Sequence, residues 1–142
     1  MIPFMAEQKT HGQKIRLNAR ERERLYQKGL EAFNTAQFYE AHEHWEEVWL
    51  ETLNPDKMFL QGLIQVAAAF HHYSRQNLQG TRNLLYAGLV KLECFPDVHG
   101  GLKIAPLREA ARTWLTALDA EETLECSTIP RIHVCDGGHP SI

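Results

Sequence analysis

Three side chains that commonly bind metal ions stand within one short stretch of the sequence. His42 and Glu46 are four residues apart, and Glu43 lies between them. Residues four apart on an α-helix project from the same side, so this imidazole and this carboxylate can reach one ion. His72 offers a second nitrogen farther along the chain. The set His42, Glu43, Glu46 and His72 is therefore a candidate site for zinc, manganese or iron.

A metal-bound water at such a site would allow hydrolysis, with the spare carboxylate as base. The stretch departs from two known metal motifs, however. In the H-E-x-x-H motif of zinc proteases a histidine stands where this chain has Glu46. In ferritin-like di-iron proteins a glutamate stands three residues before each ligating histidine, whereas alanines precede His71 and His72 here. Metal binding, with or without hydrolysis, is thus one hypothesis among several.

A second group of polar residues lies on a helix that is otherwise apolar. Residues 56–75 are apolar on nearly every side except for a stripe formed by Gln61, Gln65 and His72. A helix of this kind is buried, and a buried amide without a hydrogen bond costs about 1–3 kcal/mol. We expect the stripe to meet the polar residues of the first stretch. We call the group formed by His42, Glu43, Glu46, Gln61, Gln65 and His72 the polar seam, and Trp49 lies at its border.

Three interpretations of the polar seam remain open. It is a closed hydrogen-bond network bridged by Gln61 and Gln65, a metal or catalytic site, or a pocket for a polar ligand. Closed networks are common in cores and fix how helices align, so we favour the first. The three tryptophans, Trp45, Trp49 and Trp114, lie on apolar stripes and are interpreted as core residues. Gly62 is expected to let a neighbouring helix approach closely.

The apolar periodicity predicts five helices that would position these residues. The first begins after Asn18, which forms a capping-box pattern with Glu21, and runs to about Asn34. The others are expected over about 38–52, from Asn54-Pro55-Asp56 to about 75, from Asn77 to about 93, and from about Pro106 to Asp119. Residues 97–101 are predicted to be a loop.

Short links between consecutive helices favour antiparallel hairpins. A weak repeat at a spacing of forty residues supports two such hairpins: Phe33, Phe38, Ala41, Trp45 and Trp49 correspond to Tyr73, Leu78, Thr81, Leu85 and Leu89. The predicted fold is all-α, with about five helices arranged as two stacked antiparallel hairpins and a C-terminal helix. The predicted organisation is a flexible leader (1–17), a single helical domain (18–119) and an irregular C-terminal tail (120–142).

The composition excludes several classes of function. The chain has 142 residues, a net charge of −3 and 23% charged residues, which favours one soluble domain without a nucleic-acid surface. No run of about 18 apolar residues predicts a membrane span. Three cysteines do not form a disulfide framework, so we expect a cytoplasmic protein. The spacing of Cys126, His133, Cys135 and His139 in the tail fits no standard zinc knuckle, and nothing marks Cys94 as activated.

The stretch Phe38-Tyr39-Glu40-Ala41-His42-Glu43-His44-Trp45-Glu46-Glu47-Val48-Trp49 resembles a signature of the family called domain of unknown function 309. Leu60-Gln61-Gly62-Leu63-Ile64-Gln65, and Asn77 with Gly80 and Leu84-Leu85, resemble two further signatures of that family, and the resemblance covers roughly Leu25 to Leu118. The resemblance implies a compact all-helical domain and no established activity. It places motif positions on His42, Glu43, Glu46, Trp49, Gln61, Gly62, Gln65 and His72.

The sequence therefore predicts a non-catalytic scaffold or interaction protein, for which a homo-oligomer is one possible form. The alternative is a metal-binding protein or metal-dependent hydrolase that uses the same seam. Substrate, partner and pathway do not follow from the sequence.

Overall fold

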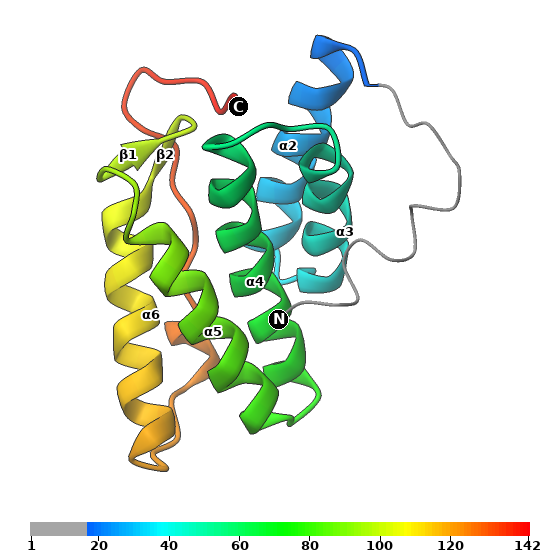
Figure 1. The fold of residues 1–142 in the computed structure, drawn as a ribbon. Coiled ribbons are helices and arrows are strands. Elements are labelled where there is room, and N and C mark those ends of the chain that lie inside the picture. Colours follow the sequence, from blue (N-terminus) through cyan, green and yellow to red (C-terminus); the bar gives the residue numbers. More distant parts are fainter. Residues whose placement is uncertain (1–16) are drawn as a thin grey trace.

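The computed structural model describes residues 17–142, which form five α-helices and one short β-hairpin (Figure 1). The helices are α2 (Ala19–Asn34), α3 (Phe38–Trp49), α4 (Asp56–Ser74), α5 (Leu78–Leu92) and α6 (Ile104–Asp119). The strands β1 (Val98–His99) and β2 (Leu102–Lys103) join α5 to α6, and a 3-10 helix, η2 (Cys126–Thr128), follows α6. The predicted all-α fold is confirmed. The predicted leader, residues 1–17, lies outside the described residues except for Leu17.

The predicted helix starts are largely confirmed by hydrogen bonds at the helix ends. The Glu21 N–H donates to Asn18 Oδ1 at 2.8 Å, and the Asn18 N–H donates back to Glu21 Oε1 at 3.1 Å, which completes the capping box. Asn77 caps α5 by accepting from the Gly80 N–H at 3.0 Å. The predicted boundaries were less accurate elsewhere, since α3 ends at Trp49 instead of near 52 and α6 begins at Ile104.

The two helical hairpins, α2–α3 and α4–α5, turn in the same way forty residues apart. Ala36 and Gln76 both have a φ of 63°, which places each in the left-handed region just after a helix. In each turn the next N–H folds back onto the preceding helix: Gln37 donates to Ala32 O at 2.8 Å, and Asn77 donates to His72 O at 2.9 Å. This shared geometry explains the repeat seen in the sequence.

Helix α4 runs through the middle of the molecule, with α2 and α3 on one side and α5 and α6 on the other (Figure 1). The closest approach to α5 occurs at two glycines. A Cβ at Gly88 would lie 2.9 Å from the Gly62 carbonyl oxygen, and one at Gly62 would lie 3.0 Å from Leu92 Cδ2. The predicted role of Gly62 in close helix approach is confirmed, and α5 is the helix that it admits.

Trp45 is fully buried between α2 and α3, as the core interpretation predicts. Its Nε1 donates to the Tyr26 carbonyl oxygen at 3.0 Å. The indole packs directly against Gly29. A Cβ at this position would lie 2.3 Å from Trp45 Nε1, so the site admits only glycine. Trp114 is also buried, at 2% exposure, whereas Trp49 is only partly buried.

Two segments differ from the sequence prediction. Residues 97–101, predicted as a loop, contain most of an antiparallel β-hairpin in which Val98 pairs with Lys103 and His99 with Leu102. The tail after α6 has little regular structure but returns along the helices towards this hairpin (Figure 1). Ile132 in the tail is 1% exposed and belongs to the core.

Candidate functional site

Two contacts between α3 and α4 determine which parts of the polar seam lie level with each other. The ring of Tyr39 lies 5.3 Å from the ring of His71, and Lys57 Nζ lies 4.2 Å from the ring centroid of Trp49. The two helices are therefore antiparallel, and residues 42–46 of α3 lie level with about residues 61–68 of α4. Gln61 and Gln65 fall within this interval. His72 lies beyond it, level with the start of α3.

The three seam residues of α3 have different surroundings. His42 and Glu46 are buried, with exposures of 4% and 2%, and His42 Nδ1 lies 3.2 Å from the Tyr39 carbonyl oxygen. Glu43 is partly exposed and faces the Tyr39 hydroxyl. The negative charge of Glu43, followed by burial and a hydrogen bond from the hydroxyl, raises the pKa of Tyr39 above its usual value. The seam therefore has a buried His42–Glu46 side and a separate exposed Tyr39–Glu43 pair.

Gln65 does not have the bridging role predicted for it. Its side chain is fully buried, and within residues 17–142 neither Oε1 nor Nε2 has a hydrogen-bond partner. The buried Nε1 of Trp49 also lacks an acceptor. An unmade hydrogen bond of this kind costs about 1–3 kcal/mol, so Gln65 adds polarity to the core without completing a network. The structure therefore shows no bridging hydrogen bond from Gln65 among residues 17–142, and a network around His42 and Glu46 stays a prediction.

His72 lies apart from the other seam residues. Its Nδ1 is 3.2 Å from Asn77 Nδ2 in the turn before α5, and its ring is 5.9 Å from the ring of His71. His71, one residue earlier, is the histidine whose ring contacts that of Tyr39 of α3, at an interplanar angle of 50°. Burial, and then the positive charges of His72 and Arg75, lower the pKa of His71 below its usual value.

The structure does not gather the four predicted metal ligands into one group. Across residues 17–142, no three His, Cys, Asp or Glu side chains are arranged so that they could hold an ion. The same result covers the tail candidates Cys126, His133, Cys135 and His139, of which His139 pairs with Glu23. Metal binding by His42 or Glu46 stays a prediction, without the support of a preformed cluster.

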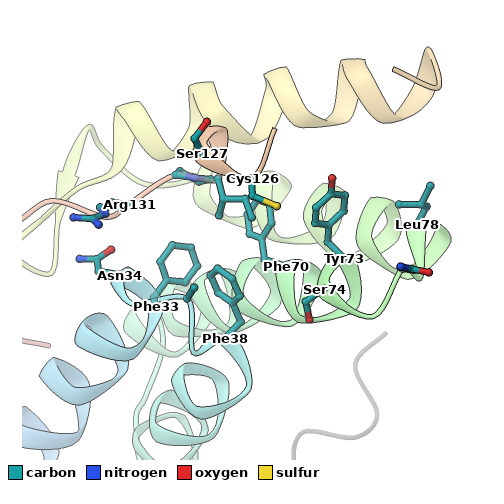
Figure 2. A pocket seen from close by; sticks show the side chains of 14 residues that line it. Phe33, Asn34, Phe38, Phe70, Tyr73, Ser74, Leu78, Cys126, Ser127 and Arg131 are labelled. Atoms are coloured by element: carbon teal, nitrogen blue, oxygen red, sulfur yellow. The ribbon is translucent and has the colours of Figure 1, made fainter. Parts of the chain in front are cut away.

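The structure also contains a groove, which we call the turn groove. It has a volume of about 860 Å³ and lies where the two hairpin turns meet the tail (Figure 2). Aromatic rings form its floor, among them Phe33, Phe38 and Phe70, whose ring centroids lie 5.1 to 6.4 Å from one another. Its lining residues are Phe33, Asn34, Ala36, Phe38, Phe70, Tyr73, Ser74, Gln76, Leu78, Cys126, Ser127, Ile129, Pro130 and Arg131.

The tail forms one wall of the turn groove and is held there by two side chains. The side-chain amide of Asn34 makes two hydrogen bonds to the main chain of Ile132. Its Nδ2 donates to the Ile132 carbonyl oxygen at 2.9 Å, and its Oδ1 accepts from the Ile132 N–H at 2.8 Å. Trp114 Nε1 donates to the Thr128 carbonyl oxygen at 3.0 Å. Because Ile132 is itself buried, the wall is fixed before any ligand arrives.

Most polar side chains of the turn groove already have partners in the protein. The Ser74 hydroxyl donates to the His71 carbonyl oxygen at 2.6 Å, and the Ser127 hydroxyl to Glu125 Oε1 at 3.4 Å. No histidine or carboxylate lines the groove beside the Cys126 thiol. A nucleophile activated by a neighbouring base would need such a group, so the lining favours binding over catalysis.

The residues of this groove could have been found in the sequence only in part. Phe33 and Phe38 match Tyr73 and Leu78 in the forty-residue repeat, which indicated that the two turns are equivalent. The side chains of Phe33 and Phe38 are buried in the core, at 1% and 7% exposure, so their apolar character alone does not show that a groove lies beside them. Ile129-Pro130 was the remaining signal, since an apolar pair in a polar tail is expected to pack against something.

Comparison with known proteins supports the resemblance noted in the sequence. Residues 26–84 match the family model described as "Domain of unknown function (DUF309)". A protein of Aquifex aeolicus (strain VF5), described as "Uncharacterized protein", is 36% identical over 78 residues, which is 54% of this chain. The match covers 23% of the Aquifex protein, so the chain spans less than a quarter of that relative's length.

The matched region contains the whole polar seam and both hairpin turns, but not the tail. No helix in the described part of the chain is both long enough and apolar enough to cross a membrane.

Proposed function

We propose that this protein is a non-catalytic binding protein that takes up an apolar small molecule in the turn groove. In this proposal the polar seam has a structural role and the groove is the functional surface. The observation that supports it is the cavity of about 860 Å³, with an aromatic floor and a fixed wall. Ligand pockets commonly have volumes of about 300–1,000 Å³ and largely apolar linings, with a few polar groups that orient the ligand.

A metal-dependent hydrolase that uses the seam is the alternative proposal. His42 and Glu46 are buried one helical turn apart, which is the feature in its favour. It requires further ligands, and Glu43 faces Tyr39 while His72 contacts Asn77. Metal analysis of the purified full chain beside a His42→Ala variant separates the two proposals, since stoichiometric metal that is lost in a folded variant would favour the hydrolase.

The binding proposal is tested by titrating the full-length protein with Nile red, an uncharged apolar dye that fluoresces in apolar surroundings. We expect saturable binding at one site. Ser74→Trp would fill the groove with a side chain that starts from an exposed position, and it is expected to abolish binding. Asn83→Trp, on the exposed side of α5 and outside the groove, is the matched control and is expected to bind as the wild type does.

Two outcomes would overturn the proposal. One is the absence of saturable binding to the folded wild-type protein. The other is equal binding by the wild type and Ser74→Trp. Should Ser74→Trp fail to fold, Leu78→Asp replaces it, because Leu78 is 55% exposed and tolerates a charge that would still oppose an apolar ligand at the groove mouth.

A further inference from the structure

We propose that the turn groove selects an amphipathic monocarboxylate, whose carboxylate lies at Arg131 and whose hydrocarbon chain extends towards Leu78. This inference rests on the proposed function, because it names the chemistry of the molecule that the groove takes up. It adds the prediction that the two ends of the groove recognise different parts of one ligand.

The shape of the groove suits a chain-like ligand. Arg131 and Asn34 lie at one end, and Tyr73 and Leu78 lie at the other (Figure 2). Phe33, Phe38 and Phe70 lie between the two ends. Because these three rings are already buried, the apolar surface that a bound hydrocarbon chain removes from water is mainly its own and that of Tyr73 and Leu78, at about 25 cal/mol for each Å² buried.

The charge of the groove is asymmetric. Arg131 carries the one formal charge among the lining side chains, and it is exposed. The described residues include no ion pair of Arg131, whereas Arg82, Arg108 and Arg112 each pair with a carboxylate. Asn34, at the same end, is already committed to the main chain of Ile132. Arg131 is therefore the group available to a ligand anion, and its planar guanidinium suits a carboxylate in particular.

The start of α3 lies at the floor of the groove, where Glu40 in the first turn opposes the positive charge of the helix N-terminus. Phe38, a floor residue, is the first residue of α3, and the N-cap Gln37 makes no side-chain hydrogen bond to the first turn. The N–H groups of that turn thus retain the partial positive charge of a helix N-terminus. The equivalent start of α5, at the opposite end of the groove, is capped by Asn77. Arg131 is therefore the feature that makes one end of the groove more positive than the other.

The groove wall is less suited to an extended peptide. A peptide that adds a strand needs a free main-chain edge. Ile132 has both main-chain groups bonded to Asn34, His133 O accepts from the Lys103 N–H at 2.8 Å, and Pro130 has no N–H. The wall therefore offers side-chain contacts more readily than a hydrogen-bond ladder, which favours a ligand without a peptide backbone.

The test is displacement of Nile red from the full-length protein by dodecanoate, kept below its critical micelle concentration, with dodecan-1-ol as the uncharged analogue. We expect dodecanoate to displace the dye at a lower concentration than dodecan-1-ol. Arg131→Gln is expected to weaken dodecanoate about tenfold, because a charge-assisted hydrogen bond is worth about 1.5–3 kcal/mol and 1.4 kcal/mol is tenfold in affinity. The same variant should leave dodecan-1-ol and Nile red unchanged, and Arg112→Gln is the control for loss of one positive charge elsewhere.

The outcomes distinguish this inference from the proposed function. Equal displacement by dodecanoate and dodecan-1-ol, with no effect of Arg131→Gln, would overturn the carboxylate preference and leave an apolar binding site. Failure of both compounds to displace dye that Ser74→Trp excludes would overturn the chain-like ligand. Failure of Nile red to bind at all would overturn the proposed function, and this inference with it.

Discussion

The polar seam and the turn groove share helix α4, and both have buried residues at their centre, but they differ in polarity and in the cavity that lies beside the groove floor. The seam is polar, and its central residues His42, Glu46 and Gln65 are buried at 4%, 2% and 0% exposure. The lining of the groove is mainly apolar. The hairpin turns and the tail surround the groove but leave a cavity between them. Polar residues on a buried helix can be recognised in a sequence. A groove cannot, because it depends on where the turns and the tail lie in the folded protein.

The two regions also differ in how they relate to known proteins. The seam lies entirely within residues 26–84, which match the family model. The floor of the groove also lies within residues 26–84, but its wall comes from residues 126–131, outside the match. The match to the family model therefore covers the seam completely and the groove only in part.

The largest expected effect concerns the core beside the seam. Trp45→Ala removes a fully buried indole and leaves the Tyr26 carbonyl oxygen without its donor. Truncation of a buried tryptophan costs about 3–5 kcal/mol, which is a large part of the stability of a domain of this size. Urea unfolding followed by circular dichroism measures the loss. Trp49→Ala, at a partly exposed position, is the matched control, and an equal or larger loss there would contradict the role assigned to Trp45.

The next effect concerns the wall of the groove. Asn34→Ala removes two hydrogen bonds to the main chain of Ile132, at about 1 kcal/mol each. We expect a loss of about 2 kcal/mol in the free energy of unfolding and faster hydrogen exchange in residues 129–135, with α3 unchanged. Hydrogen exchange read by mass spectrometry tests this, with Asn83→Ala as control. Unchanged exchange in the tail would show that Asn34 does not hold the wall.

The helical fold could be predicted from the sequence because its signals are local. The capping box at Asn18, the cap at Asn77 and the apolar stripes each act within one or two turns of helix, and the structure confirms them. The antiparallel hairpins followed from short links and from the forty-residue repeat. The β1–β2 hairpin was missed because its strands are two residues long and carry no recognisable alternation.

The candidate site was less predictable because it depends on contacts between distant residues. Helical spacing grouped His72 with Gln61 and Gln65, but the alignment of α3 with α4 places His72 away from His42 and Glu46 and brings its neighbour His71 against Tyr39. The turn groove depends on Asn34 meeting Ile132, 98 residues away. A periodicity argument does not extend to pairings of that range.

A smaller effect tests whether the buried amide of the seam stabilises the fold. Gln65→Leu replaces the amide with an apolar side chain of similar size, and no hydrogen bond of Gln65 is lost in doing so. We expect the free energy of unfolding to stay within about 1 kcal/mol of the wild type or to rise. Urea unfolding measures it, with Gln61→Leu at a partly exposed position as control. A decrease of more than about 2 kcal/mol in the free energy of unfolding would instead support a closed hydrogen-bond network in the seam.

The smallest expected effect is a pH dependence at His71, which lies between the two regions. Its ring contacts that of Tyr39 of α3, and its carbonyl oxygen accepts from Ser74 in the groove. Burial and the charges of His72 and Arg75 lower the pKa of His71 in the folded protein below its ordinary value of 6.5, although Glu40 opposes this. The unfolded chain therefore binds the proton more readily than the folded one, so this group lowers the stability as the pH falls below about 6.5.

His71→Phe keeps an aromatic ring against Tyr39 and removes the titration. We expect its free energy of unfolding to fall less than that of the wild type between pH 7 and pH 5, as measured by urea unfolding at each pH. The exposed tail residue His133 is the site of a control variant, His133→Phe, which should follow the wild type. No histidine or carboxylate lines the turn groove, so Nile red affinity of the folded protein should stay constant over this range. A parallel loss of affinity and stability would show that the seam and the groove are coupled, because His71 itself does not line the groove.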